Sequence, residues 1–222
     1  MGKNSILKRH HKKFLELVVN EPYIRKRFYW TGGTVLSEFY LHHRESEDID
    51  LFSEHQEIHI ASINKFVALA GKKLGAKEIA FKRYLGLYSY VFQLPHVQLK
   101  VDFNYYPFPR IQKGGTWKGL EIDSLEDITA NKIHTIYTHA RDRDFVDLFF
   151  IMKDKDFDLK KMISLAKAKI DWHIDPIQLG QTFTQVVVLK DIPRMIVPFD
   201  RHEMEKFFLE EAKKLQSDIF KA

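Results

Sequence analysis

The sequence predicts an α/β (α+β) fold, in which a small mixed β-sheet is flanked by helices and followed by a helical C-terminal part. Five short stretches of strand character occur before residue 106, and helical patterns separate some of them. They are residues 28–31, 48–52, 78–83, 87–94 and 97–105. From Ser124 onward the apolar residues recur at helical spacing. We therefore expect a core at residues 1–123 and a helical region at residues 124–222 that packs on it.

The composition narrows the class of protein. The 222 residues are 45% hydrophobic and 29% charged, as in a globular protein. The sequence has no cysteine, which excludes disulfides, thiolate zinc sites and cysteine nucleophiles. The N-terminal stretch lacks the apolar region of a signal peptide, and no apolar run approaches membrane-spanning length. We therefore expect a cytoplasmic protein without a membrane partner, and its net charge of +5 suits a binder of nucleotides or RNA.

Residues 4–20 predict an amphipathic helix with a basic outer side. Its apolar residues recur at helical spacing and are Ile6, Phe14, Leu15, Val18 and Val19. A basic cluster around Lys8–Lys13 has Lys8, Arg9, Lys12 and Lys13 facing away from them. This cluster is either a solvated face or a contact for RNA.

The stretch that follows, residues 28–53, carries the chemistry around which the chain is organised. A strand at residues 28–31 leads into Gly32 and Gly33, and residues 34–40 then have a helical pattern. The apolar side of that helix consists of Val35, Leu36 and Phe39. Glycine permits a sharp turn, and the N–H groups at a helix N-terminus favour a phosphate.

Two carboxylates follow on the strand at residues 48–52. Asp48 and Asp50 are two residues apart, so both project from the same face of the strand. Adjacent carboxylates repel each other, and Mg²⁺ (or Mn²⁺) is held by such a pair together with the phosphates of a nucleotide. Arg44 and Ser46 lie just upstream, where they could reach phosphate oxygens. The stretch therefore predicts a site for a metal and a nucleotide.

A third carboxylate, Asp102, belongs to the predicted strand at residues 97–105. Apolar and polar residues alternate cleanly there, which places Asp102 on the face opposite the core, together with Gln98 and Lys100. From the residues alone, Asp102 is either a further metal ligand or a solvated carboxylate at the edge of the sheet.

Two neighbouring stretches carry weaker signals. His55 and His59 are four residues apart near the start of a helix predicted over residues 56–74. Zinc would need a third ligand and no thiolate is present, so we expect a surface pair. Residues 106–119 are rich in proline and glycine and predict a loop, either a hairpin or a flap.

Beyond residue 123 the sequence predicts helices. Ser124 has the character of an N-cap for a helix that carries Lys132 in its middle, and the next helix carries Asp144 and Asp147 one turn apart. These acids either serve the site or belong to a charged helix pair in which Arg141 and Arg143 neutralise them. Further helices are expected at residues 159–170, 176–188 and 201–220, with a linker at residues 191–199.

These motifs, taken in order, resemble those of a known family. Gly32-Gly33-Thr34, a short helix and Arg44-x-Ser46-x-Asp48-Ile-Asp50-Leu-Phe are similar to the first motif of nucleotidyltransferases of the DNA-polymerase-beta type. The residues of the motif and their order are most similar to those of the AbiEii/AbiGii-type toxin nucleotidyltransferases. Asp-Ile-x-x-x-Lys, ending at Lys132, and Arg-Asp-Phe-x-Asp-Leu, with Asp144 and Asp147, resemble later motifs of that family. Thr34 stands where the superfamily more often has serine, and either hydroxyl could serve.

The resemblance implies roles for these residues. The turn at Gly32, Gly33 and Thr34 would hold a triphosphate, with Arg44 and Ser46 beside it. Asp48, Asp50 and Asp102 would bind the metal and carry the catalysis. Lys132 would contact the triphosphate, and Asp144 would support the site. Catalysis would then consist of positioning and electrostatic stabilisation, without a covalent protein intermediate.

We therefore expect a metal-dependent nucleotidyltransferase that moves a nucleoside monophosphate from an NTP to an acceptor. RNA, above all tRNA, is the expected acceptor, and the resemblance implies a toxin of a type IV-like toxin–antitoxin system with an antitoxin partner. Three alternatives remain open. They are a non-catalytic nucleotide or RNA binder on the same fold, a structural or antitoxin-like interaction protein, and a nucleotidyltransferase acting on a protein or small-molecule hydroxyl.

Overall fold

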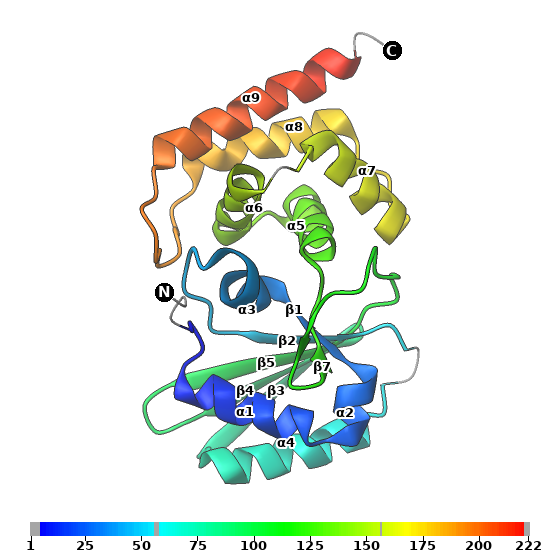
Figure 1. Ribbon diagram of the computed structural model, residues 1–222, viewed down its shortest axis with the longest axis vertical. Helices are drawn as coiled ribbons and strands as arrows, with labels where there is room; N and C mark the ends of the chain where they lie inside the picture. Colours follow the sequence, from blue (N-terminus) through cyan, green and yellow to red (C-terminus); the bar gives the residue numbers. More distant parts are fainter. Residues whose placement is uncertain (1–4, 56–57, 156, 220–222) are drawn as a thin grey trace. The chain divides into compact units, whose positions relative to one another are not determined.

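The chain divides into two compact units (Figure 1). The structure is a computed structural model that describes residues 5–55, 58–155 and 157–219. The first unit consists of residues up to Tyr40 together with Ser46–Ser124, and the second consists of Leu41–Glu45 and the residues from Leu125 onward. The first unit contains the sheet and the second is helical apart from its connecting segments. The α/β (α+β) fold class with a helical C-terminal part is thus confirmed.

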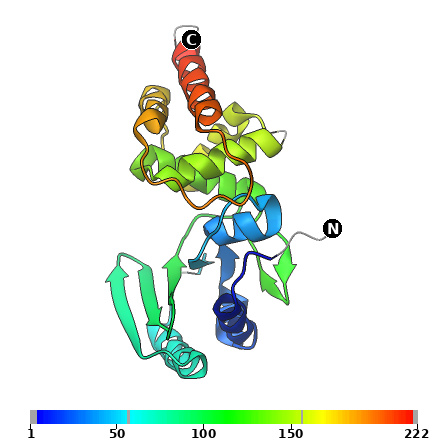
Figure 2. The same ribbon diagram turned by 90° about the vertical axis from the view of Figure 1, so that its left-hand side faces the viewer.

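The sheet of the first unit has five strands in the order β1-β2-β5-β4-β3. The strands are β1 (Tyr29–Thr31), β2 (Ile49–Ser53), β5 (Gln98–Tyr105), β4 (Leu87–Gln93) and β3 (Glu78–Tyr84). β2 and β5 run parallel, and the other neighbours are antiparallel, so the sheet is mixed as expected. β5 lies in the middle of the order, while β3 forms one edge, which Figure 2 shows as part of a hairpin with β4.

Helices cover this sheet on both sides. Figures 1 and 2 show α1 (Arg9–Val19), α2 (Pro22–Arg27) and α4 (Ile60–Leu74) on one side and α3 (Gly32–Val35) on the other. The predicted helix at 4–20 begins only at Arg9, and its apolar residues Phe14, Leu15 and Val18 are buried as expected. The predicted helix at 56–74 begins at Ile60, and its first residue, Gln56, lies outside the described residues.

The helix after the glycine pair differs from its prediction. It begins at Gly32, two residues earlier than expected, and continues from Leu36 to Leu41 as a π-helix. Val35 and Leu36 are buried, but Phe39 is 36% exposed and meets the ring of Trp30 edge-on at 5.5 Å. The expectation that Phe39 belongs to the buried side was therefore wrong, because the wider turn of a π-helix shifts later side chains around the helix axis.

The loop predicted at residues 106–119 contains a small hairpin at its end. β6 (Thr116–Trp117) pairs with β7 (Leu120–Glu121), and the turn between them uses Lys118 and Gly119 at positive φ. Glycine adopts that conformation without strain, so the turn chemistry explains why the hairpin closes here.

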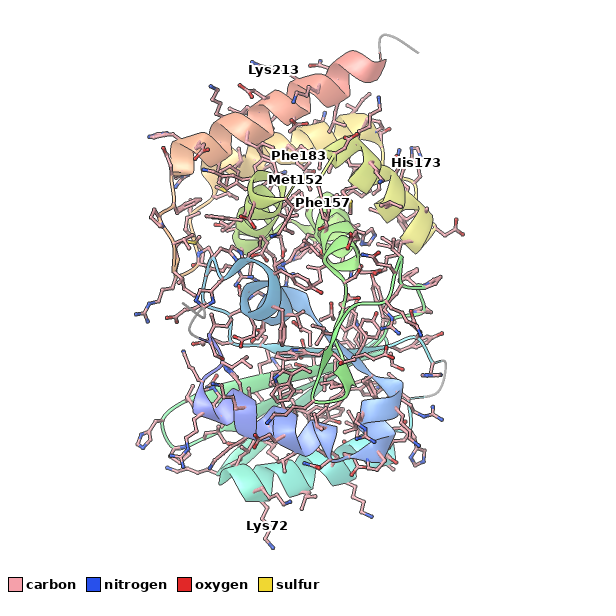
Figure 3. All side chains as sticks on the ribbon, viewed as in Figure 1. Lys72, Met152, Phe157, His173, Phe183 and Lys213 are labelled. Carbon is pink, nitrogen blue, oxygen red and sulfur yellow. The ribbon has the colours of Figure 1, made fainter. Side chains whose placement is uncertain are left out.

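The second unit is built from helices that pack around aromatic side chains. They are α5 (Leu125–His139), α6 (Asp142–Asp154), α7 (Leu159–Ile170), α8 (Pro176–Thr184) with the 3₁₀ turn η2 (Gln185–Val188), and α9 (Arg201–Ile219). Phe208 meets Phe145 at 5.0 Å and Phe183 at 5.1 Å, and all three are fully buried. Figure 3 shows Phe183 on the inner side of α8, whereas Lys213 points outward from α9. None of the helices described here has the length and apolar content needed to cross a membrane.

The segment Leu41–Glu45 joins the second unit through its backbone. The Glu45 N–H donates to the carbonyl oxygen of Arg194 at 2.8 Å, and the Ile196 N–H donates to that of His43 at 2.8 Å. The predicted linker at residues 191–199 therefore pairs with a segment about 150 positions away, a contact that local sequence patterns cannot reveal.

Candidate active site

Parallel pairing of β2 and β5 brings the aspartates of the first unit together. Asp50 on β2 lies directly opposite Asp102 on β5, so both side chains project from the same face of the sheet. Asp48 directly precedes β2. The ammonium of Lys100 lies 2.7 Å from Asp102 Oδ2 and 3.6 Å from Asp48 Oδ2. Asp48, Lys100 and Asp102 therefore form one charged cluster, with Asp50 on the same face.

Asp102 is not the solvated edge carboxylate that one interpretation of the sequence gave. Its residue is only 7% exposed, because β5 is the central strand and is flanked by β2 and β4. Asp102 Oδ1 has no hydrogen-bond partner among the described residues. A buried carboxylate oxygen without a partner costs free energy and is characteristic of a place where an ion or ligand binds.

Lys100 is a member of this cluster that sequence reasoning missed. Burial would lower its pKa, but the hydrogen bond to Asp102 and the charges of Asp102, Asp48 and Asp50 raise the pKa above its ordinary value. The lysine is therefore a permanent cation beside the carboxylates. The signal was its place two residues before Asp102 on the same face, but only the strand order shows which acids it meets.

Gly32 makes direct contact with the carboxylate of Asp50. Its backbone has a φ of +83°, and a Cβ atom at this position would lie 2.1 Å from Asp50 Oδ2. A side chain is therefore excluded by contact as well as by backbone conformation. This close approach explains the glycine at the start of the turn, and Gly33, which follows it, is only half-buried.

Thr34 and Ser46 lie against the backbone just before β2 begins. The fully buried Thr34 hydroxyl lies 2.5 Å from the carbonyl oxygen of Asp48 and 2.9 Å from Ser46 Oγ. Thr34 therefore ties α3 to the residue that carries the first carboxylate. The structure gives its hydroxyl a positioning contact.

The N-terminal part of α1 holds the same loop from the other side. The buried His11 lies with Nε2 3.0 Å from the carbonyl oxygen of Glu47, and the Lys8 N–H donates to His11 Nδ1 at 3.2 Å. Lys8 also pairs with the carboxylate of Glu47. In this arrangement His11 is neutral and donates from Nε2, so it fixes the backbone just before Asp48.

This histidine should make the fold less stable in acid. Burial, reinforced by the neighbouring His10, lowers the pKa of His11 from 6.5 to about 4. The folded pKa of His11 lies below its unfolded value, so the stability that the neutral side chain contributes is complete above about pH 6.5. That stability is lost as the pH falls through about 4, and the free energy of unfolding then drops by about 3 kcal/mol. Urea unfolding across this range should show a steeper loss for the wild type than for His11→Gln. Parallel curves for the two proteins would contradict the assignment.

A second charged cluster lies inside the helical unit. The Arg44 guanidinium donates through Nε and Nη2 to the two oxygens of Asp147 at 2.6 and 2.8 Å, and His43 Nε2 lies 2.8 Å from Asp147 Oδ1. Lys132 Nζ lies 2.5 Å from Asp147 Oδ2 and 2.7 Å from Asp144 Oδ1. Arg141 also donates to Asp144. Both aspartates are fully buried.

The cations of this cluster keep its acids ionised. Burial would raise the pKa of Asp147, but Arg44 and Lys132 hold it well below its ordinary value. Lys132 and Arg141 likewise overcome burial and lower the pKa of Asp144. The cations that the structure places against these two acids are thus Arg44, Lys132 and Arg141. The structure gives Arg44 a buried bidentate contact with Asp147.

The predicted site residues therefore fall into two groups. The first unit brings together Gly32, Gly33, Thr34, Ser46, Asp48, Asp50 and Asp102, and the second contains Arg44, Lys132 and Asp144. Among the described residues, no three Asp, Glu or His side chains are gathered as a ready-made metal site. His55 and His59 are both exposed, as a surface pair should be. The donor set Asp48, Asp50 and Asp102, with an unpartnered Asp102 oxygen, nevertheless fits a hard divalent cation chemically.

The class of protein is that of the nucleotidyl transferases, which a family match over most of the chain shows. The family model described as "Nucleotidyl transferase AbiEii toxin, Type IV TA system" matches residues 16–220. The chain therefore belongs to the AbiEii toxin family of nucleotidyl transferases, and the resemblance in its motifs is confirmed.

Individual relatives agree with this membership. A protein of Aquifex aeolicus (strain VF5), named Uncharacterized protein aq_aa25, is 29% identical over 172 residues, which is 76% of this chain and 79% of that protein. The crystal structure of JHP933 from Helicobacter pylori has a TM-score of 0.56 at 19% identity and covers 96% of this chain and 92% of its own. Another H. pylori structure, described as a proposed nucleotidyltransferase, has a TM-score of 0.60 at 20% identity. The match covers 97% of this chain and 98% of that one. At these identities the two structures show the fold alone.

Proposed function

We propose that this chain is a metal-dependent nucleotidyltransferase that moves a nucleoside monophosphate from an NTP to RNA, with tRNA as the expected acceptor. The observation that carries the proposal is the placement of Asp50 opposite Asp102 on parallel strands, with Asp48 on the same face and Gly32 against the Asp50 carboxylate. Residues 1–123 would form the catalytic core and residues 124–222 the helical region. Since nucleoside triphosphates and tRNA are cytoplasmic, we propose that the reaction takes place there.

Asp48, Asp50 and Asp102 would hold the metal. An all-oxygen donor set suits Mg²⁺ or Mn²⁺. The bound ion would neutralise charge on the leaving pyrophosphate and lower the pKa of the attacking hydroxyl. The chain itself orients these carboxylates: Gly32 supports Asp50, Thr34 and His11 hold the backbone at Asp48 and Glu47, and pairing with β2 places Asp102.

The nucleotide contacts remain predictions. The turn at Gly32–Thr34 and Ser46 would bind the triphosphate in the first unit. Lys132 would contribute positive charge to the phosphates, with Asp144 orienting its ammonium at 2.7 Å. For Arg44 we propose a supporting contact, since its guanidinium donates to both oxygens of the buried Asp147.

Substituting Gly32 should disturb catalysis more than stability. In Gly32→Ala the new methyl group would push on the Asp50 carboxylate, and we expect the transfer rate to fall by about a hundredfold or more. Gly75→Ala is the matched control, because Gly75 also has a positive φ of +71° but no atom within 4 Å of its Cβ position. Both variants bear a similar backbone strain of about 1–2 kcal/mol. Equal rates in the two variants would remove the role given to Gly32.

A basic hollow in the first unit supports an RNA acceptor. It has a volume of about 430 Å³, and its lining includes Tyr29, His55 and the cations Arg25, Lys26, Arg27 and Arg110. The carboxylates Glu54 and Glu121 also line it and pair with Arg110, so its excess positive charge comes from Arg25, Lys26 and Arg27. The buried Tyr29 hydroxyl has no hydrogen-bond partner among the described residues. β2 runs from Asp50 toward this end of the sheet, since Tyr29 pairs with Phe52 and Thr31 with Asp50. Phosphates of an RNA bound here would lie on the same unit as the carboxylates.

Acceptor labelling tests the proposal. The protein is incubated with each labelled NTP, total RNA and Mg²⁺ or Mn²⁺, and the products are resolved. We expect labelled tRNA, no labelling with a chelator, and a steep loss of labelling as salt rises. Label confined to the protein or to a small molecule would refute the RNA acceptor. Stabilisation by an NTP without any labelled product would favour a non-catalytic binder.

The toxin role has its own test. Family membership supports a toxin of a type IV toxin–antitoxin system, and we propose that a cognate antitoxin protein counteracts it. Expression of the chain without such a partner should inhibit growth, and Asp50→Asn should not. Equal inhibition by both proteins would separate toxicity from nucleotidyl transfer.

A further inference from the structure

We propose that Lys100 is the built-in counter-ion of the metal site, whose ammonium holds Asp48 and Asp102 until a divalent cation displaces it. The proposal rests on the metal-dependent function given above and adds a residue that controls metal affinity. Lys100 thereby acts as a positioning residue, because it works through the carboxylates.

The geometry of the cluster carries the proposal. Lys100 Nζ hydrogen-bonds to Asp102 Oδ2 at 2.7 Å and also lies 3.6 Å from Asp48 Oδ2. These two carboxylates belong to different strand segments and have no covalent reason to stay close. The ammonium bridges them, which offsets the repulsion that two neighbouring carboxylates would otherwise exert.

The same position cannot serve two cations. A divalent ion bound to Asp48 and Asp102 would lie within a few ångströms of the Lys100 ammonium, and like charges at that range repel strongly. In the present arrangement no three acidic or histidine side chains of the described residues form a ready-made metal site. The Lys100 ammonium instead lies between Asp48 and Asp102, two of the three proposed ligands. A divalent cation must therefore displace the ammonium in order to bind.

Two further features suit an exchange. The Lys100 side chain is 40% exposed, and its flexible stem lets the ammonium swing toward solvent. Asp102 Oδ1, by contrast, is buried and lacks a hydrogen-bond partner among the described residues. The lysine therefore satisfies only one oxygen of Asp102 and leaves the other for an incoming ion. A purely structural ion pair gives no reason for that unsatisfied oxygen.

The first test measures Mn²⁺ affinity without any substrate. In Lys100→Met the stem remains and the charge is lost, so Mn²⁺ should bind about tenfold more tightly or better by calorimetry. Lys100→Arg keeps the charge and should remain near the wild type. Lys72→Met removes the same charge from α4, where the side chain is exposed and points away from the sheet (Figure 3), and it should also bind like the wild type.

A second test uses the wild-type protein and does not depend on folding of a variant. Reductive methylation of lysines is followed by mass spectrometry with and without Mn²⁺, with Lys72 as the internal reference. If Mn²⁺ releases the ammonium, methylation of Lys100 should accelerate several-fold relative to Lys72. An unchanged ratio with Mn²⁺ bound would overturn the proposal.

The outcomes separate this inference from the function on which it rests. Wild-type Mn²⁺ binding that Asp50→Asn removes, combined with unchanged affinity in Lys100→Met, would overturn the counter-ion role and leave the metal site standing. No Mn²⁺ binding by the wild type, even with a triphosphate present, would overturn both. Tighter binding in Lys100→Met and faster methylation of Lys100 would establish the exchange.

Discussion

Replacing Asp50 with asparagine is expected to lower the rate of nucleotidyl transfer by about a thousandfold or more. Asp50 lies opposite Asp102 and against Gly32, at the centre of the proposed metal ligands. An amide in its place removes one negative charge from the site. Loss of several kcal/mol of charge stabilisation in the transition state corresponds to a rate loss of that size. The measurement is transfer of labelled nucleotide to RNA at saturating Mg²⁺.

The fold should survive this substitution. Asp50 is only half-buried, and removing one carboxylate relieves repulsion between the acids, so the free energy of unfolding should change little. Asp154→Asn is the control, because Asp154 is an exposed aspartate of the helical unit, with 56% of its side chain accessible. It should transfer at the wild-type rate. A rate for Asp50→Asn within tenfold of the wild type would remove Asp50 from the metal site.

The second large effect concerns stability. Asp147→Asn should lower the free energy of unfolding by about 3–5 kcal/mol at neutral pH. The fully buried Asp147 carboxylate binds His43, Arg44 and Lys132, and Arg44 is itself nearly inaccessible to solvent. Neutralising the acid removes the negative charge that accepts two hydrogen bonds from the buried guanidinium. The cost of losing a buried charge pair exceeds that of losing an ordinary hydrogen bond.

An exposed ion pair in the same unit provides the control for this prediction. Glu203 pairs with Lys153 on the surface, and about half of each side chain is accessible. Glu203→Gln should therefore cost less than about 1 kcal/mol, because solvent already screens that pair. Urea unfolding of the two variants and the wild type makes the comparison. A loss below about 1 kcal/mol for Asp147→Asn would show that water or another group compensates Arg44.

Local pattern was enough to predict most of the helices and strands and the common face of two candidate site residues. The alternation in residues 97–105 predicted β5, and the helical spacing in residues 159–170 predicted α7 with the same limits that the structure shows. The two-residue spacing of Asp48 and Asp50 placed both side chains on one face. Such inferences succeed because helical and strand periodicities are properties of the backbone and need no information from elsewhere in the chain.

Details that depend on contacts within an element were harder to predict. The π-helix after Val35 and the exposure of Phe39 do not follow from a regular helical pattern. His11 lies among the basic residues of the predicted N-terminal helix, yet it is buried and contacts the backbone of Glu47. A histidine beside lysines gives no sequence signal for burial, since its environment is set by the loop that packs on it.

The sequence by itself determined most of the helices and strands, the family motif and the chemical character of the carboxylates. Only the tertiary structure decided that Asp102 is buried on the central strand, that Lys100 bridges it to Asp48, and that Asp147 receives Arg44 from 103 residues away. The physical reason is that burial and charge pairing depend on strand order and on loops that meet across the chain. The sequence around a side chain is the same whether that side chain pairs with a carboxylate or is exposed to water. Long-range packing decides which of the two occurs.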